Sequence, residues 1–369
     1  MIRKLLMLIC VACMACADPF VNMASAHDVI PTSDAFYSAD SASSFEYEQS
    51  MRFIGRFDRR KKNQLGFTWA GSAFEFNFEG THAEIKLSSD RRIRFEVKVD
   101  GVASDLWVDG KVQSYVLASA LDAGVHHIRV TRLTEPFDVI SAIHSVPKVE
   151  GQLLAPPGTP KRRLLVIGDS ISAGYGVEGK DQSCHYSMET SNQQLGYAAL
   201  AADTLNADLH SIAWSGIGIW RSYSEKYPIN PTIYTRYQRT LADDHTSKWD
   251  VAGYQASAIM IAIGTNDFWD GNVTEQYKIN MLELIALLKS QYPSKPIFLI
   301  VSPLLVGKVR DSHKSILESI SKISDGVVTI DIGVAKPKDG FGCDYHPSEI
   351  TQRRMSEYLV DELKVNLNW

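Results

Sequence analysis

The hydrophobic period of this chain changes near residue 150, and that change limits what the chain can fold into more than any other feature. Between residues 44 and 147, apolar and polar residues alternate with a period of two, as in Phe74, Phe76 and Phe78. This alternation is typical of strands with one buried face. Further along, apolar runs alternate with helical stretches. The two halves therefore predict different architectures.

The first half predicts several short β-strands joined by turns. Asp100-Gly101 and Asp109-Gly110 are hairpin signals between alternating runs, and no long helical pattern interrupts them. The strand-like runs lie at 51–57, 74–79, 83–87, 93–99, 125–130 and 139–146. Together with the run between the two turns, these make seven or more strands, which indicate a β-sandwich that we assign to residues 27–150.

The second half predicts a parallel sheet covered by helices on both faces. Residues 151–162 contain three prolines and two glycines and are predicted to be a linker, so the second domain comprises residues 163–369. Strand-like runs lie at 164–167, 208–213, 257–263, 296–301 and 327–332, and helical stretches at 193–205, 274–290, 311–323 and 348–365. Strands that alternate with helices give an α/β domain.

The N-terminus predicts export. Arg3 and Lys4 precede the apolar run 5–15, and small residues follow, so we interpret residues 1–26 as a signal peptide whose cleavage falls after Ala17 or Ala26. The apolar run is short for a membrane span, so no integral membrane contact is expected. The protein is expected to be secreted or periplasmic. Lipid modification at Cys13 or Cys16 is the less favoured alternative.

The net charge of the chain narrows the class of partner. The whole chain carries a net charge of −5, which argues against nucleic acid as a partner.

The cysteine content allows one disulfide in the mature chain. Of five cysteines, Cys184 and Cys343 are the two that survive every cleavage considered. An exported chain permits a disulfide between them, and two separate buried thiols are the alternative. No zinc-type cluster is present in the mature sequence, and we expect a monomer.

Four short motifs carry the candidate chemistry. They are Gly168-Asp169-Ser170, Trp214-Ser215-Gly216, Gly264-Thr265-Asn266-Asp267 and Asp344-Tyr345-His346-Pro347. The first three follow apolar runs, and the carboxyl ends of parallel strands are where α/β sheets bind ligands. Ester hydrolysis requires a nucleophile, a base and donors for the oxyanion. The candidate nucleophile is Ser170 and the candidate base is His346. The candidate oxyanion donors are the backbone N–H groups of Ser170 and Gly216 and the side-chain amide of Asn266.

These motifs, in this order, resemble the four blocks of SGNH (GDSL-type) hydrolases. Together with the N-terminal sandwich and the export signal, the chain resembles carbohydrate esterase family 2. The resemblance implies a jelly-roll domain followed by a flavodoxin-like α/β/α domain. It also implies the removal of acetyl groups from plant polysaccharides such as xylan and glucomannan, as an acetyl xylan esterase does. No metal or organic cofactor is implied.

One position departs from the superfamily pattern. Most SGNH enzymes have Asp three residues before the histidine, where this chain has Cys343; Asp344 lies two residues before it. Residues two apart share a face only on extended chain. Two hypotheses follow: Asp344 orients His346 as a third triad member, or a backbone carbonyl orients it within a Ser–His dyad.

Aromatic residues near the motifs are candidates for sugar binding. Trp269 is the preferred platform, Trp214 and Trp220 are weaker candidates, and core packing is the alternative for each. Asp169 and Asp267 are expected to brace their loops. The sequence thus predicts an exported serine esterase that deacetylates polysaccharide or oligosaccharide. The alternatives are an esterase for bacterial wall glycan or lipid, and a carbohydrate-binding protein with an inactive hydrolase domain.

Overall fold

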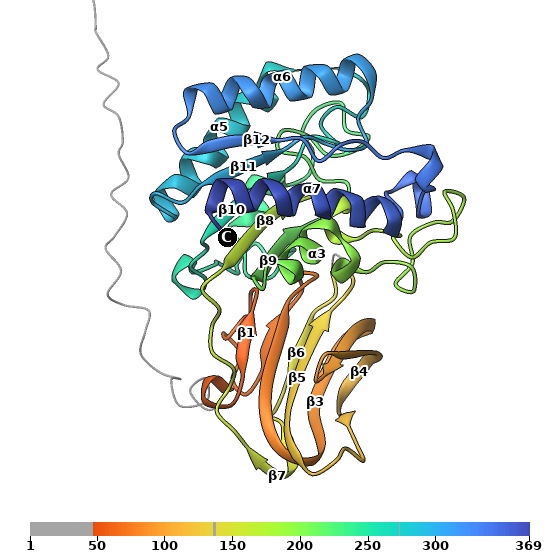
Figure 1. The fold of residues 1–369 in the computed structure, drawn as a ribbon, viewed down its shortest axis with the longest axis vertical. Helices are drawn as coiled ribbons and strands as arrows, with labels where there is room; N and C mark the ends of the chain where they lie inside the picture. The colour runs from red at the N-terminus through yellow and green to blue at the C-terminus, as the bar shows by residue number, and fades with distance from the viewer. Residues whose placement is uncertain (1–46, 136–137, 273) are drawn as a thin grey trace, which may run out of the picture. The chain divides into compact units, whose positions relative to one another are not determined.

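A computed structural model describes residues 47–135, 138–272 and 274–369 (Figure 1). The predicted signal peptide and the candidate lipidation cysteines lie outside these residues. Within the described parts, no helix combines the length and the apolar character that crossing a bilayer requires. The description below follows the chain from the β-rich half to the α/β half.

The N-terminal half is a curled antiparallel sheet. Its strands are β1 (Arg52–Ile54), β2 (Leu65–Phe67), β3 (Ala73–Val99), β4 (Val102–Ala118), β5 (Gly124–Arg132), β6 (Ser141–Ile143) and β7 (Lys148–Leu153). β3 pairs with every other strand except β2, and its two halves flank β5. The β-rich domain is therefore organised around one long strand.

The sequence suggested three separate strands where the structure has the single strand β3. The chain bends within β3 at register shifts, one of which begins at Gly80 with φ +152°. A Cβ atom at Gly80 would lie 1.9 Å from the carbonyl oxygen of Glu150, so glycine is what permits this close crossing. β7 also continues to Leu153, beyond the predicted domain end at residue 150.

The C-terminal half contains a five-stranded parallel sheet in the order β12-β11-β10-β8-β9. The strands are β8 (Arg163–Gly168), β9 (Asp208–Ala213), β10 (Ala258–Ala262), β11 (Ile297–Ile300) and β12 (Val327–Ile330). The helices are α2 (Ser170–Ala173), α3 (Tyr197–Thr204), α4 (Ile233–Tyr237), α5 (Glu275–Gln291), α6 (Gly307–Ile323) and α7 (Glu349–Leu367), with short 3₁₀ turns at Gln193–Leu195, Val251–Gly253, Pro337–Asp339 and Cys343–Tyr345. This strand order is that of flavodoxin-like folds.

Alternation along the strands creates two cores, one on each face of the parallel sheet. Leu165 and Ile167 of β8 pack with α5 and α6, whereas Leu164 and Val166 pack with α3 and α7 (Figure 1). The predicted helices on both faces are thereby confirmed. The strand order also reverses at β8, because β9 lies on one side and β10 on the other. Such a switch point leaves a crevice at the carboxyl ends of the strands.

Buried ion pairs connect the β-rich half to the amino-terminal end of β9. Arg52 contacts the carboxylate of Glu75 at 2.6 Å and that of Asp208 at 2.5 Å. Both carboxylate side chains are almost fully buried. Asp208 is the first residue of β9, so this contact lies at the amino-terminal end of the parallel strands, away from their carboxyl ends.

Candidate active site

Ser170 lies where β8 gives way to the one-turn helix α2. Asp169 caps this turn by accepting a hydrogen bond from the N–H of Ile171 at 3.0 Å, and Gly174 ends it in the left-handed conformation. The cap fixes the residue directly before the serine. As the first residue of the helix, Ser170 has a backbone N–H without an intrahelical acceptor.

The side chains of Ser170 and His346 meet at this point. Nε2 of His346 lies 2.8 Å from Oγ of Ser170, and Nδ1 lies 3.1 Å from the carbonyl oxygen of Cys343. A carbonyl only accepts, so Nδ1 carries the proton and Nε2 is free to accept from the serine hydroxyl. Burial lowers the pKa of His346, against the opposing effect of the nearby carbonyl groups. A neutral imidazole in this geometry can act as a general base.

A disulfide supports the carbonyl that holds His346. Cys343 is fully buried and bonded to Cys184, across 159 residues of chain. The N–H of Cys343 also donates to Gly176 at 3.0 Å, and the N–H of Asp344 donates to Cys184 at 3.0 Å. The histidine loop is therefore tied to the segment that follows the nucleophile.

The carboxylate of Asp344 points to partners other than the imidazole of His346. It accepts from the hydroxyl of Tyr175 at 2.7 Å and lies 2.8 Å from Nδ1 of His185. Although burial opposes it, these hydrogen bonds lower the pKa of Asp344. The ring of Tyr175 in turn stacks on His346 with centroids 4.0 Å apart. Asp344 thus contacts Tyr175, which stacks on the imidazole, while the hydrogen-bond partner of Nδ1 is the carbonyl of Cys343.

Two loops bring the candidate oxyanion donors to the same edge. Gly216 follows β9 with φ +77°, a conformation that disfavours other residues. Among the described residues, none accepts a hydrogen bond from its N–H. Asn266 follows β10 and donates one amide hydrogen to the carbonyl of Ile217 at 2.8 Å. Its second amide hydrogen remains available to a substrate oxygen.

Asp267 fixes the loop that contains Gly216. Its carboxylate accepts from the backbone N–H groups of Ile219 at 3.0 Å, Trp220 at 2.8 Å and Arg221 at 3.2 Å. Burial nevertheless raises the pKa of Asp267 to about 6 and that of Asp169 to about 6. Asp169 contacts its own loop and Asp267 contacts the loop that contains Gly216, so both aspartates brace loops at the site, as expected from the sequence.

The three candidate tryptophans occupy different environments. Trp269 is 40% exposed, and its ring packs edge-on against Tyr223, which is 62% exposed. Trp214 packs against the core with Arg236 over its ring, and Trp220 is partly buried beside Arg221. Trp269 is therefore the one of the three that offers exposed aromatic surface.

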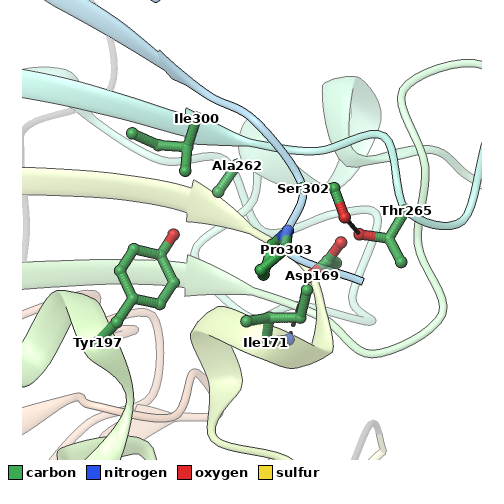
Figure 2. Close-up of a pocket in the computed structure, with 8 residues that line it drawn as sticks. All are labelled: Asp169, Ile171, Tyr197, Ala262, Thr265, Ile300, Ser302 and Pro303. Atoms are coloured by element: carbon green, nitrogen blue, oxygen red, sulfur yellow. Dashed lines mark hydrogen bonds between the residues drawn. The ribbon is translucent and has the colours of Figure 1, made fainter. Parts of the chain in front are cut away.

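A small cavity lies beneath the strand ends, next to Asp169 and Ile171 (Figure 2). Its volume of about 10 Å³ accommodates at most one water molecule. Thr265 and Ser302, on its wall, lie 2.8 Å apart through their hydroxyl oxygens. The cavity is thus too small for a sugar or acyl group. In the described ranges, no three His, Cys, Asp or Glu side chains are grouped to bind a metal ion.

Two side chains at the site were not identified from the sequence. Tyr175 stacks on His346, and Glu135 of the β-rich half contacts Ser215. Neither lies within a recognised motif, and Glu135 lies in the other half of the chain. Tyr223 also reaches this region, where its backbone N–H donates to the carbonyl of Gly216 at 2.7 Å.

Known families account for both halves. The family "Carbohydrate esterase 2 N-terminal" matches residues 53–157, and the "GDSL-like Lipase/Acylhydrolase family" matches residues 166–354. The Cellulase/esterase CelE of Acetivibrio thermocellus is 31% identical over 337 residues; the match covers 89% of this chain but 41% of that protein. An acetylxylan esterase / glucomannan deacetylase of Cellvibrio japonicus is 25% identical, with 90% of this chain and 94% of that protein covered.

Solved structures agree with this assignment. A family two carbohydrate esterase from Clostridium thermocellum, in complex with cellohexaose, is 32% identical with a TM-score of 0.81. The alignment covers 86% of this chain and 99% of that chain. The chain therefore belongs to carbohydrate esterase family 2, with a β-rich N-terminal domain followed by an SGNH (GDSL-like) hydrolase domain.

Proposed function

We propose that this protein is an exported serine esterase that removes O-acetyl groups from plant polysaccharide. The observation that carries the proposal is the 2.8 Å contact between Oγ of Ser170 and Nε2 of His346. Nucleophile and base lie within hydrogen-bonding distance at the crevice where flavodoxin-like sheets bind ligands.

In the first half of the reaction, Oγ of Ser170 attacks the acetyl carbonyl carbon while Nε2 of His346 takes the hydroxyl proton. The N–H groups of Ser170 and Gly216 and the free amide hydrogen of Asn266 stabilise the tetrahedral oxyanion. The intermediate then expels the sugar oxygen, which takes the proton from His346. The acetyl group remains on Ser170.

In the second half, His346 removes a proton from water as the water attacks the acetyl carbonyl. Collapse of the second tetrahedral intermediate releases acetate and returns the proton to Ser170. The carbonyl of Cys343 holds Nδ1–H in both halves, so the same tautomer serves each step. Asp344 acts through Tyr175 in this mechanism and does not contact reacting atoms.

The exposed aromatic pair supports a carbohydrate substrate. Tyr223 is tied to Gly216 by its backbone, and Trp269 lies three residues after Asn266, so both rings belong to the loops that carry the oxyanion donors. Exposed Trp and Tyr rings offer a large apolar face with a polar group at its edge, which suits the stacking of a sugar ring. The Cellvibrio relative is named for acetylxylan and glucomannan, and we extend these substrates to this chain.

Acetate release from acetylated xylan and glucomannan tests the proposal, with 4-nitrophenyl acetate as a generic ester. Release that is absent in Ser170→Ala supports the deacetylase. Turnover of the small ester alone retains the serine mechanism and rejects these polysaccharides. No turnover of any ester rejects the esterase.

A second candidate activity is non-catalytic binding of a β-linked glucan. Two observations support it. The exposed pair of Tyr223 and Trp269 offers aromatic surface to a sugar chain, and the Clostridium relative was solved in complex with cellohexaose. Cellohexaose affinity that is retained in Ser170→Ala and lost in Trp269→Ala supports this binding; equal affinity of wild type and Trp269→Ala rejects it.

A further inference from the structure

A buried carboxyl group of the β-rich domain lies beside the loop that carries Gly216. Glu135 follows β5 and is 5% exposed. Its Oε2 accepts a hydrogen bond from the N–H of Ser215 at 2.9 Å, and its Oε1 contacts the hydroxyl of the same residue. Glu135 therefore holds both hydrogen-bond donors of the residue directly before Gly216.

The backbone around Glu135 is fixed by neighbours from both domains. Arg132 donates from Nε to the carbonyl of Thr134 at 3.1 Å. The N–H of Gln193 donates to the carbonyl of Leu133 at 3.0 Å, and the hydroxyl of Tyr186 donates to that of Glu135 at 3.3 Å. These contacts fix the direction in which the glutamate side chain points.

Ser215 and the N–H of Gly216 are adjacent parts of one chain segment. The nitrogen of Gly216 is bonded to the carbonyl carbon of Ser215, so a displacement of Ser215 reorients the Gly216 N–H. The other side of the loop is held by Asn266, through the carbonyl of Ile217, and by Tyr223. Glu135 supplies the opposing anchor, from the β-rich domain.

We propose that Glu135 is a positioning residue, which aligns the Gly216 N–H with the oxyanion by holding Ser215. The inference rests on the proposed serine mechanism, because it assigns Gly216 a transition-state role. Its consequence is that the β-rich domain helps to set the geometry of the active site. A displaced donor weakens transition-state binding while leaving ground-state binding largely intact.

The test compares Glu135→Ala with Glu135→Gln in the full chain. Burial raises the pKa of Glu135 to about 8, so the side chain is neutral near pH 7 and glutamine keeps its size and an acceptor for Ser215. With 4-nitrophenyl acetate, Glu135→Ala is expected to lower kcat about 10- to 100-fold with KM little changed. Glu135→Gln is expected to restore most of the lost kcat.

Glu75→Ala is the matched control. Glu75 is also a buried glutamate of the β-rich domain, but its partner Arg52 lies at the amino-terminal end of β9. Ser170 lies at the other end of the parallel strands, after the carboxyl end of β8. This variant is expected to lower the melting temperature and leave kcat per folded molecule unchanged. Folded fractions are measured by circular dichroism before each assay, so that loss of fold is not counted as loss of rate.

The outcomes separate this inference from the proposed function. If wild type hydrolyses no ester, the proposed function is rejected, and the positioning role that rests on it is rejected as well. If wild type is active and Ser170→Ala is not, the function stands. In that case, a kcat of Glu135→Ala within about twofold of wild type overturns the positioning role. Equal losses of kcat in Glu135→Ala and Glu75→Ala, or no rescue by glutamine, also overturn it.

Discussion

Nδ1 of His346 lies 3.1 Å from the carbonyl oxygen of Cys343, so a neutral backbone group occupies the position that a carboxylate holds in a Ser-His-Asp triad. The carbonyl fixes the tautomer and the ring orientation. It supplies no full negative charge to stabilise the imidazolium that forms during the reaction. Of the two hypotheses from the sequence, this geometry favours the Ser–His dyad.

The dyad predicts a small effect of Asp344→Asn. The amide retains an acceptor for Tyr175, and the Nδ1 contact with Cys343 is untouched. We expect kcat/KM for 4-nitrophenyl acetate to fall less than about tenfold, whereas removal of a true triad aspartate costs about 10⁴-fold. A loss of the larger size would show that Asp344 reaches the imidazole during catalysis.

The disulfide is predicted to affect both stability and rate. It closes a long loop and holds the residue whose carbonyl orients His346. The double variant Cys184→Ser/Cys343→Ser is expected to lose about 2–5 kcal/mol of unfolding free energy, measured in urea. Its kcat should also fall, because the carbonyl of residue 343 is less well fixed. Unchanged stability and kcat would show that the histidine loop is held by its hydrogen bonds alone.

Asn266→Ala is predicted to act mainly on kcat. The variant loses the free amide hydrogen and also the contact with Ile217 that anchors the Gly216 loop. Loss of one oxyanion donor typically costs about 10²- to 10³-fold in kcat. Steady-state kinetics should show this loss with KM changed much less. A rise in KM at constant kcat would instead assign Asn266 to ground-state binding.

Glu135 is predicted to contribute a fall in stability as the pH rises. Burial raises its pKa to about 8 from 4.5, next to Asp169, Tyr175 and Tyr186. Between these pH values the native state keeps a proton that the unfolded state has released, so the unfolding free energy declines until about pH 8 and then levels off.

The comparison of melting temperatures in wild type and Glu135→Gln measures this effect. Above about pH 7, Asp169 and Asp267, whose pKa values are about 6, are mostly ionised, so the Glu135→Gln substitution should remove most of the remaining decline up to about pH 8.5. Parallel curves for the two proteins over this interval would contradict the assignment.

Much of this fold could be predicted because the two halves have different periodicities. Strand β8 and helix α7 correspond closely to the runs at 164–167 and 348–365, since their apolar patterns are long and bounded. β3 was not recognised as one strand. Its bends arise from bulges and from the Gly80 crossing, which depend on strands paired from elsewhere in the sequence.

At the site, residues within the short motifs were identified, including the bracing Asp169 and Asp267, whereas supports from elsewhere in the chain were not. Ser170 and His346 could be paired because each belongs to a motif at a strand or helix end. Tyr175 and Glu135 reach the site through tertiary packing, and nothing in their sequence neighbourhoods indicates the contacts with His346 and Ser215. Asp344 is near His346 in sequence, but its left-handed backbone at φ +51° belongs to a turn that the spacing rule did not anticipate.

The intact mass of the protein, quenched in acid during turnover of 4-nitrophenyl acetate, tests the central claim most directly. We predict that a fraction of wild-type molecules gains the mass of one acetyl group, that peptide mapping places it on Ser170, and that Ser170→Ala shows neither the adduct nor turnover. An acetyl group on another residue during turnover, or undiminished turnover by Ser170→Ala, would contradict the account.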